Sequence, residues 1–339
     1  MPDSVIGFGA IAVAGVISGS FTLPMKFTRS WAWENTWLVW TLLALVLLPT
    51  GMAVANLPHI GEVYARVDPR LLATIVTLGV FWGVTQVLFG LAVDAIGMAL
   101  AFAIVPGVSA ALGSLIPLVR FHHERLLRAD GVSVMVGVAL IAVGVTLCAS
   151  AGWHRSVDQA AVRIEPKRRY VSGLALALSS GLGASMLNIG LAFGGPLLES
   201  AQQMGADAQW APNAVWLPIM LGGAIPNTIY CIHRLRTNRT GARFVDSGTA
   251  ACWLYALVMA AFWFGSISLY GVAVGRLGNW GTVVGWPVFT SVLVVTASIS
   301  GIATGEWRDA GRRSLELQCG GVAVLVAAVF VLAAASRFV

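Results

Sequence analysis

The chain has 339 residues, of which 58% are hydrophobic and only 11% are charged, and its formal net charge is +6. A soluble domain carries about 25% charged residues, so this composition excludes an ordinary soluble protein. The charges gather in short patches, and the runs between them, of about 18 residues or more, are typical of membrane-spanning helices. Basic residues in cytoplasmic loops account for the positive charge, which argues against binding to nucleic acid.

Ten apolar runs follow one another along the chain. In order they cover residues 5–25, 37–55, 71–93, 95–119, 131–150, 171–198, 208–232, 247–275, 277–305 and 317–336. Each run is about twice the length of a barrel strand, which favours helices. The sequence therefore predicts an all-α integral membrane protein with ten transmembrane helices. Residues 1–150 would hold the first five spans, 151–170 a basic linker loop, and 171–339 the last five.

An internal repeat relates the third and fourth spans to the eighth and ninth. A displacement of 181 residues aligns Trp82 with Trp263 and Pro106 with Pro287, with eight identities in 26 positions. The repeat unit contains five spans, and because five is odd, the second half enters the membrane from the opposite side. We therefore predict two inverted five-helix repeats, an arrangement that many secondary transporters share.

Pro106 and Pro287 lie well inside their runs, where a proline removes a backbone donor and kinks the helix. Paired interruptions at matching positions of two halves point to a transporter site. We predict that both prolines mark helix breaks used in gating, with a role in packing alone as the alternative.

Lys and Arg residues are distributed unequally between the two sides of the predicted bundle. One side carries 14 of them, including those of residues 163–169 and 234–243, and the other side carries 7. The positive-inside rule then places these loops in the cytoplasm and both termini outside. We expect a multi-pass protein of a bacterial inner membrane, with both termini in the periplasm. The exception is the segment 120–130, which places three Arg and two His on the outer side.

Several segments, in order along nearly the whole chain, resemble the L-rhamnose–proton symporter family of the drug/metabolite transporter superfamily. They are Trp31-Ala32-Trp33-Glu34, the stretch from Trp82-Gly83 to Gly97-Met98, the run from Gly183 to Asn188, the run from Ile219 to Ala224 with Asn227, and the run from Glu306 to Arg313. The resemblance implies ten helices in two inverted halves and the uptake of a deoxysugar coupled to protons.

A sugar site needs partners for hydroxyl groups and a flat apolar surface, which amide and aromatic side chains supply. The residues that we predict to bind substrate are Gln86, Asn188, Asn227, Tyr230, Tyr270, Thr290, Trp82 and Trp263. An amide in hydrocarbon must face a cavity or a partner. For a threonine such as Thr290, a hydrogen bond to its own helix is the alternative, and for the tryptophans an anchoring position at the headgroups.

Coupling to protons requires a group that changes its protonation, and the cores of the ten runs contain no Asp, Glu, Lys, Arg or His. Glu34, at the entrance to the second span, is the predicted coupling residue, because burial beneath neighbouring tryptophans would disfavour its charged form. A structural ion pair with Lys26 is the alternative. Asp94, between the third and fourth spans, is a second candidate, although we prefer a role in capping the next helix.

No pattern indicates an enzyme, a metal site or a cofactor. The sequence lacks His-Glu-x-x-His, and its glycine-rich stretches open no phosphate-binding strand–turn–helix unit. The expected partners are a small-molecule substrate, most simply a sugar, a proton or another coupling ion, and the lipid bilayer. An exporter or facilitator of another small metabolite on the same fold, and a channel or assembly subunit, remain open.

Overall fold

A computed structural model describes residues 2–96, 98–159, 167–305, 307–308 and 310–335. In this part of the chain the regular elements are all helical, and ten helical segments are long and apolar enough to cross a membrane. The prediction of an all-α protein with ten spans is therefore confirmed.

Each predicted run corresponds to one helical span, with boundaries that differ by up to six residues except at the end of α7, which extends to Gln159. The first half contains α1 (Pro2–Ser20), a 3-10 turn (Leu23–Phe27), α2 (Trp33–Thr41), the π-helix η2 (Leu42–Leu47), α3 (Leu48–Asn56), α4 (Ile60–Ala65), α5 (Pro69–Ile96), α6 (Met98–Phe121) and α7 (Ala129–Gln159). The second half contains α8 (Lys167–Phe193), α9 (Gly195–Gln203), α10 (Asn213–Asn238), α11 (Ala250–Arg276), α12 (Gly281–Ala303) and α13 (Arg312–Ala335).

Three features depart from the predicted pattern. The second span, Trp33–Asn56, is continuous but passes through the π-helical segment η2. The short helices α4 and α9 lie between spans and contact one another. Much of the predicted linker 151–170 is helical, because α7 continues to Gln159 and α8 begins at Lys167, while residues 160–166 lie outside the described part of the chain.

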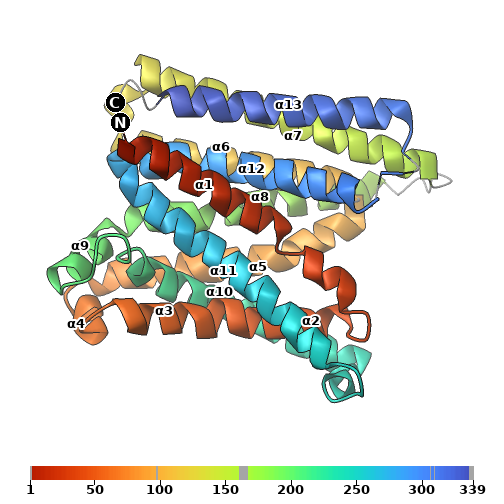
Figure 1. The fold of residues 1–339 in the computed structure, drawn as a ribbon, viewed down its shortest axis with the longest axis horizontal. Helices are drawn as coiled ribbons and strands as arrows, with labels where there is room; N and C mark the ends of the chain where they lie inside the picture. The colour runs from red at the N-terminus through yellow and green to blue at the C-terminus, as the bar shows by residue number, and fades with distance from the viewer. Residues whose placement is uncertain (1, 97, 160–166, 306, 309, 336–339) are drawn as a thin grey trace.

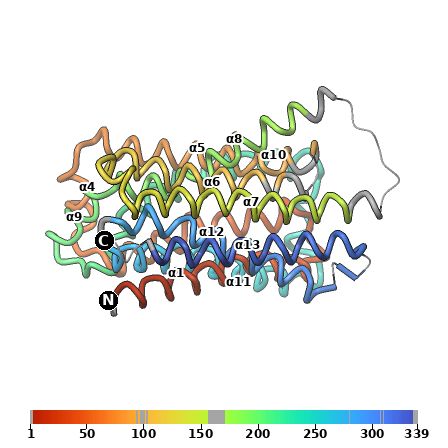
Figure 2. The backbone as a smooth tube through the Cα atoms, turned by 90° about the horizontal axis from the view of Figure 1, so that it is seen from above, coloured from red at the N-terminus to blue at the C-terminus, as the bar shows by residue number. Residues whose placement is uncertain are grey.

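The long helices run roughly side by side between two ends of the bundle (Figure 1). The start of α1, the end of α13, α4 and α9 lie at one end, which we call the terminal end; the start of α2 and the end of α10 lie at the other, which we call the opposite end. Figure 2 shows α7 and α13 side by side along one face of the molecule, where the two helices pack together.

Much of the packing among the other eight spans joins the first half of the chain to the second. Helix α5 packs against α8 and α10, and α11 packs against α1 and α2. Helix α6 packs against α8, while α12 packs against α1. Contacts between α6 and α12 and between α10 and the α2–α3 span add to this packing.

Glycines allow these helices to approach closely. Gly79 and Gly83 of α5 face the backbone carbonyl groups of Ile219 and Gly223 in α10, with no room between them for a side chain. Small residues spaced four apart allow helices in a membrane to approach closely in this way. Helix α10 is thereby held against the middle of α5.

At the terminal end, α4 is fastened to the second half of the chain. The hydroxyl of Ser200 donates a hydrogen bond to the carbonyl of Val63 (2.9 Å), and that of Tyr64 donates to the carbonyl of Ala214 (3.1 Å). Burial raises the pKa of Tyr64 well above its ordinary value, so the hydroxyl keeps its proton as a donor.

Candidate functional site

Trp82 and Trp263 meet at the centre of the bundle. Each occupies the middle of its helix, α5 or α11, and their rings stack with centroids 5.4 Å apart and an interplanar angle of 18°. Both are buried, with 1% and 8% of their surface exposed. They are therefore packed inside the protein and do not anchor at the headgroups.

Gln86 lies one helical turn after Trp82 and is only half-buried. Within the described part of the chain its amide makes no hydrogen bond, which leaves two donors and one acceptor available. Tyr230 of α10 is half-buried and its ring meets Trp33 edge-on at 6.2 Å. The hydroxyl of Thr290 instead donates back to its own helix, to the carbonyl of Trp286 at 2.9 Å.

Asn227 of α10 is buried and joins three helices. Its amide nitrogen donates to the carbonyl groups of Gly223 (2.9 Å) and Gly83 (3.3 Å), and its oxygen accepts a hydrogen bond from the indole of Trp37 (3.3 Å). Both amide hydrogens are used within the protein, so in this conformation Asn227 has no donor left for a ligand.

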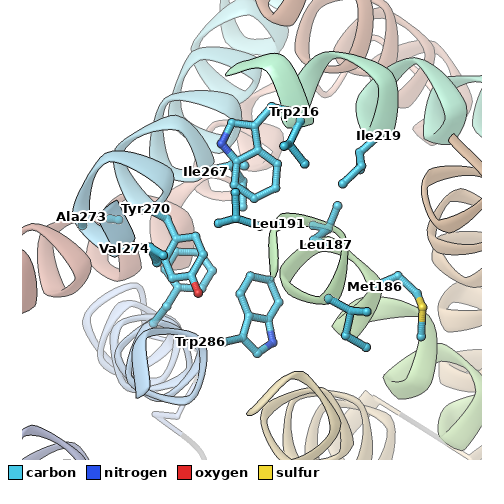
Figure 3. Packing of buried hydrophobic residues seen from close by; sticks show 14 of the residues in the cluster. Met186, Leu187, Leu191, Trp216, Ile219, Ile267, Tyr270, Ala273, Val274 and Trp286 are labelled. Atoms are coloured by element: carbon cyan, nitrogen blue, oxygen red, sulfur yellow. The ribbon is translucent and has the colours of Figure 1, made fainter. Parts of the chain in front are cut away.

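Asn188 of α8 is fully buried and joins four helices. Its amide nitrogen donates to the carbonyl groups of Gly113 in α6 (2.7 Å) and Thr282 in α12 (2.8 Å), and its oxygen accepts from the hydroxyl of Tyr270 in α11 (2.6 Å). Figure 3 shows Tyr270 and Trp286 pointing toward one another between α11 and α12. We call this set the Asn188 tie; it lies in the half of the bundle nearer the terminal end.

Pro106 and Pro287 both lie inside unbroken helices, α6 and α12. The hydroxyl of Ser291 donates to the carbonyl of Pro287 at 2.7 Å. The indole of Trp286, next to Pro287, donates to the hydroxyl of Ser109 in α6 at 3.1 Å. In this conformation the helices continue through both prolines, and a gating role stays a prediction.

Glu34 lies in the first turn of α2, at the opposite end, and is 3% exposed. Its carboxylate accepts hydrogen bonds from the amide of Asn238 (2.9 Å), the last residue of α10, and from the hydroxyl of Thr240 (2.7 Å), two residues later. The amide of Asn35 donates to the carbonyl of Thr240 at 3.0 Å. We call this set the Glu34 tie; it fastens α2 to the end of α10.

The structure gives the proposed ion pair of Glu34 with Lys26 no direct support. The ammonium group of Lys26 donates to the hydroxyl of Thr304 at 2.8 Å, while the hydrogen-bond partners of Glu34 are neutral and the cation that acts on its carboxylate is Arg234. The side chain of Asp94, the second candidate acid, lies outside the described part of the chain.

Sequence reasoning missed the neighbours of the central ring pair. Trp40 of α2 meets Trp263 edge-on, with centroids 5.3 Å apart, and Trp37 at 4.5 Å. Trp37 in turn stacks on Trp33, which is 40% exposed, so five tryptophan rings are in continuous contact from the opposite end to Trp82. The spacing of Trp33, Trp37 and Trp40 on one face of a helix was the available signal.

Two hollows on the surface, of about 290 and 620 Å³, lie along α7 and α6. They are lined by Ala142, Val143, Thr146 and Leu147, and by Leu115, Ile116, Val119 and Arg120. None of the predicted site residues lines either of them. The candidate site is therefore the buried centre around Trp82 and Trp263, whose walls touch in this conformation.

Ten spans with buried polar ties near both ends and an aromatic centre define a polytopic membrane protein of the transporter type. The comparison with known families makes this specific: the profile of the L-rhamnose-proton symport protein (RhaT) family matches residues 4–336. The chain belongs to this family. It is accordingly a multi-pass inner-membrane protein and a transporter, not an enzyme.

Curated relatives resemble the chain over nearly its whole length. The L-rhamnose-proton symporter of Mannheimia succiniciproducens is 26% identical over 326 residues, which cover 93% of both chains. The L-rhamnose-proton symporters of Escherichia coli O17:K52:H18 and Shigella boydii serotype 18 are 25% and 26% identical, over 93% of this chain and 94% of theirs.

Proposed function

We propose that this protein takes up a sugar of the L-rhamnose type, a deoxysugar, together with protons, by alternating access. Membership of the symporter family, with relatives of that name matching over 93% of the chain, is the observation that carries the proposal. The same observation favours sugar uptake over export or facilitated movement of another small metabolite.

The contacts between helices support two inverted repeats, residues 1–150 and 171–339. In such a repeat, α5 corresponds to α11, and the α2–α3 span corresponds to α10. The contact of α5 with α10 should then have a counterpart in a contact of α11 with α2, and both contacts occur. A hydrogen bond repeats as well. The hydroxyl of Thr85 donates to the carbonyl of Trp82 (2.8 Å), and that of Ser266, 181 residues later, donates to the carbonyl of Trp263 (2.7 Å).

The stacked pair Trp82 and Trp263 then indicates where the two-fold axis of the repeat lies. Two residues that a two-fold rotation interchanges can touch only beside the rotation axis. Their contact at 5.4 Å supports an axis through the middle of the bundle, where the substrate sites of inverted-repeat transporters lie. We propose these two rings and the unpaired amide of Gln86 as contacts for the substrate.

The two ties suggest how access alternates. Release of the Asn188 tie would free α8 from α6, α11 and α12 toward the terminal end, and release of the Glu34 tie would free α2 from α10 at the opposite end. Sealing one end while the other opens is the requirement of alternating access. Asn188, Asn227, Tyr230, Tyr270 and Thr290 would contact substrate only after their present contacts change.

The proposal is tested by uptake of radiolabelled L-rhamnose into proteoliposomes that contain the purified protein. We expect saturable accumulation when the outside is made more acidic than the inside, because proton entry then drives sugar entry. Collapse of the gradient with a protonophore should reduce uptake to equilibration. Equal uptake with and without the gradient would favour a facilitator, and no uptake of L-rhamnose would reject the substrate assignment.

We further propose that the opposite end faces the cytoplasm and both termini face the periplasm, on the distribution of basic residues. In a Cys319→Ala background, which removes an exposed native cysteine, Ala242→Cys should resist an impermeant thiol reagent in intact cells. Gln203→Cys, exposed on α9 at the terminal end, should react readily. The reverse pattern of labelling would overturn the orientation and leave the fold unaffected.

A further inference from the structure

Trp40 and Thr41 carry buried polar groups that the protein leaves without partners. The two residues are 1% and 0% exposed, and neither the indole nitrogen of Trp40 nor the hydroxyl of Thr41 makes a hydrogen bond. Inside a membrane, no water is at hand to satisfy such groups, and an unsatisfied buried polar group is destabilising. Two consecutive residues in this state call for an explanation.

The free hydroxyl of Thr41 distinguishes it from the other buried threonines in the described spans. The hydroxyl of Thr36 donates to that of Thr28 (3.3 Å), and those of Thr85 and Thr290 donate to a backbone carbonyl of their own helix (2.8 and 2.9 Å). Such a bond satisfies the hydroxyl at once. Thr41 stands immediately before the π-helix η2, and π-helical turns occur frequently at functional sites.

The surroundings of Trp40 distinguish it from another tryptophan with an unpaired nitrogen. Trp216 is equally buried, but its indole nitrogen lies against Gly271, only 2.6 Å from where a β-carbon would stand, so backbone covers it. Trp40 lies instead among movable side chains, the rings of Trp37, Trp263 and Phe21. Its nitrogen can become accessible when those rings separate.

Trp40 and Thr41 also lie on the same helix as Glu34, six and seven residues further on, a separation of about 10 Å along the helix axis. A displacement of α2 caused by binding at Trp40 would therefore reach the Glu34 tie directly. A coupled carrier requires such a link between its substrate and its proton-binding group.

We propose that Trp40 and Thr41, together with the stacked pair Trp82 and Trp263, hold the sugar. The indole N–H of Trp40 donates to a sugar hydroxyl, the hydroxyl of Thr41 donates or accepts, and the aromatic rings cover the apolar face of the sugar ring. This inference rests on the proposed transport function and adds a specific site to it. The sugar enters when the contact of Trp40 with Trp263 opens.

The test compares binding of L-rhamnose, measured by calorimetry on the purified protein, with thermal stability in the absence of sugar. Thr41→Val keeps the shape but removes the hydroxyl, and Trp40→Phe keeps an aromatic ring but removes the N–H. Each should weaken binding about tenfold, the effect of losing one buried hydrogen bond. Thr41→Val should melt at the same temperature as the parent or higher, because it removes an unsatisfied group.

Trp216→Phe is the matched control, since it removes the same group from an equally buried tryptophan; we expect unchanged affinity. Thr41→Ser retains the hydroxyl and should bind as the parent does. The proposed site would be overturned if Trp40→Phe and Thr41→Val both bound L-rhamnose as the parent does, or if Trp216→Phe lost as much affinity as they do. Transport of L-rhamnose by the parent would still support the proposed function in that case. A parent that binds and transports no L-rhamnose would overturn the proposed function, and with it this site.

Discussion

Glu34→Gln should abolish the concentration of sugar by proteoliposomes while leaving its equilibration across the membrane intact. Glutamine has nearly the same size, and its side-chain oxygen can still accept the hydrogen bonds of Asn238 and Thr240, so the Glu34 tie keeps its geometry. Glutamine cannot gain or lose a proton. If Glu34 carries the coupling proton, sugar movement then no longer depends on the proton gradient.

The size of the effect follows from the gradient. One pH unit is equivalent to about 1.4 kcal/mol, so a carrier that moves one proton with each sugar can accumulate sugar up to about tenfold. We expect an inside-to-outside sugar ratio close to this value for the parent and close to one for Glu34→Gln. The measurement is the steady-state ratio of labelled L-rhamnose under an imposed pH gradient.

Glu316→Gln provides the control, because Glu316 is an acid at the start of α13 that is exposed and pairs with Arg312 (2.8 Å). This variant should accumulate sugar as the parent does. Accumulation by Glu34→Gln equal to that of the parent would mean that Glu34 has only a structural role at the end of α10, and the coupling proton would have to bind elsewhere.

The ten spans could be predicted because they depend on a property of the sequence alone. Hydrocarbon excludes charges and demands a satisfied backbone, so long charge-free runs become helices whatever their neighbours are. The four-residue spacing of Gly79 and Gly83 likewise marks a place of close helix contact, although only the structure identifies α10 as the partner.

The state of each polar side chain could not be predicted in this way. Asn188, Asn227 and Gln86 are all amide side chains inside apolar runs. The two asparagines donate both amide hydrogens in hydrogen bonds within the protein, whereas Gln86 donates neither. The carbonyl groups that accept from Asn188 lie 75 and 94 residues away in the chain. Of the two that accept from Asn227, one belongs to its own helix and the other, that of Gly83, to the neighbouring helix α5. Only tertiary structure decides such pairings.

Dependence on tertiary structure also explains why the unpaired nitrogen of Trp40 and the hydrogen bonds of the Glu34 tie could not be predicted from the sequence. A tryptophan inside an apolar run is most often a packing residue, and only its neighbours reveal that its nitrogen is unpaired. The bond of Asn35 to Thr240 joins residues 205 positions apart in the chain. The predicted burial of Glu34 is confirmed, but its hydrogen-bond partners Asn238 and Thr240 could not be inferred from nearby residues.

Gly79→Ala should be among the most damaging single substitutions in the protein. A β-carbon at Gly79 would collide with the backbone carbonyl of Ile219 in α10, and a backbone atom cannot rotate away as a flexible side chain can. Helix α10 would have to move, and the bond from Asn227 to the carbonyl of Gly83 (3.3 Å), one turn along the same contact, would be lost.

We expect a loss of about 3 kcal/mol in the free energy of unfolding, at the upper end of the cost of overpacking, and a melting temperature lower by roughly 6 °C or more. The measurement is thermal unfolding of the purified protein in detergent, with the yield of monodisperse protein as a second readout. Sugar binding should weaken as well, because α10 holds Trp37 through Asn227, and Trp37 packs on Trp40.

Gly90→Ala is the control, because Gly90 lies on the same helix, is exposed, and has no atom within 4 Å of the position of a new β-carbon. This variant should unfold at the temperature of the parent or slightly above it, since alanine favours a helix by up to about 1 kcal/mol over glycine. Equal melting temperatures for Gly79→Ala and Gly90→Ala would mean that α5 and α10 pack less closely than the structure shows. The proposed effect of this crossing on the tryptophan centre, through Asn227, would then be contradicted as well.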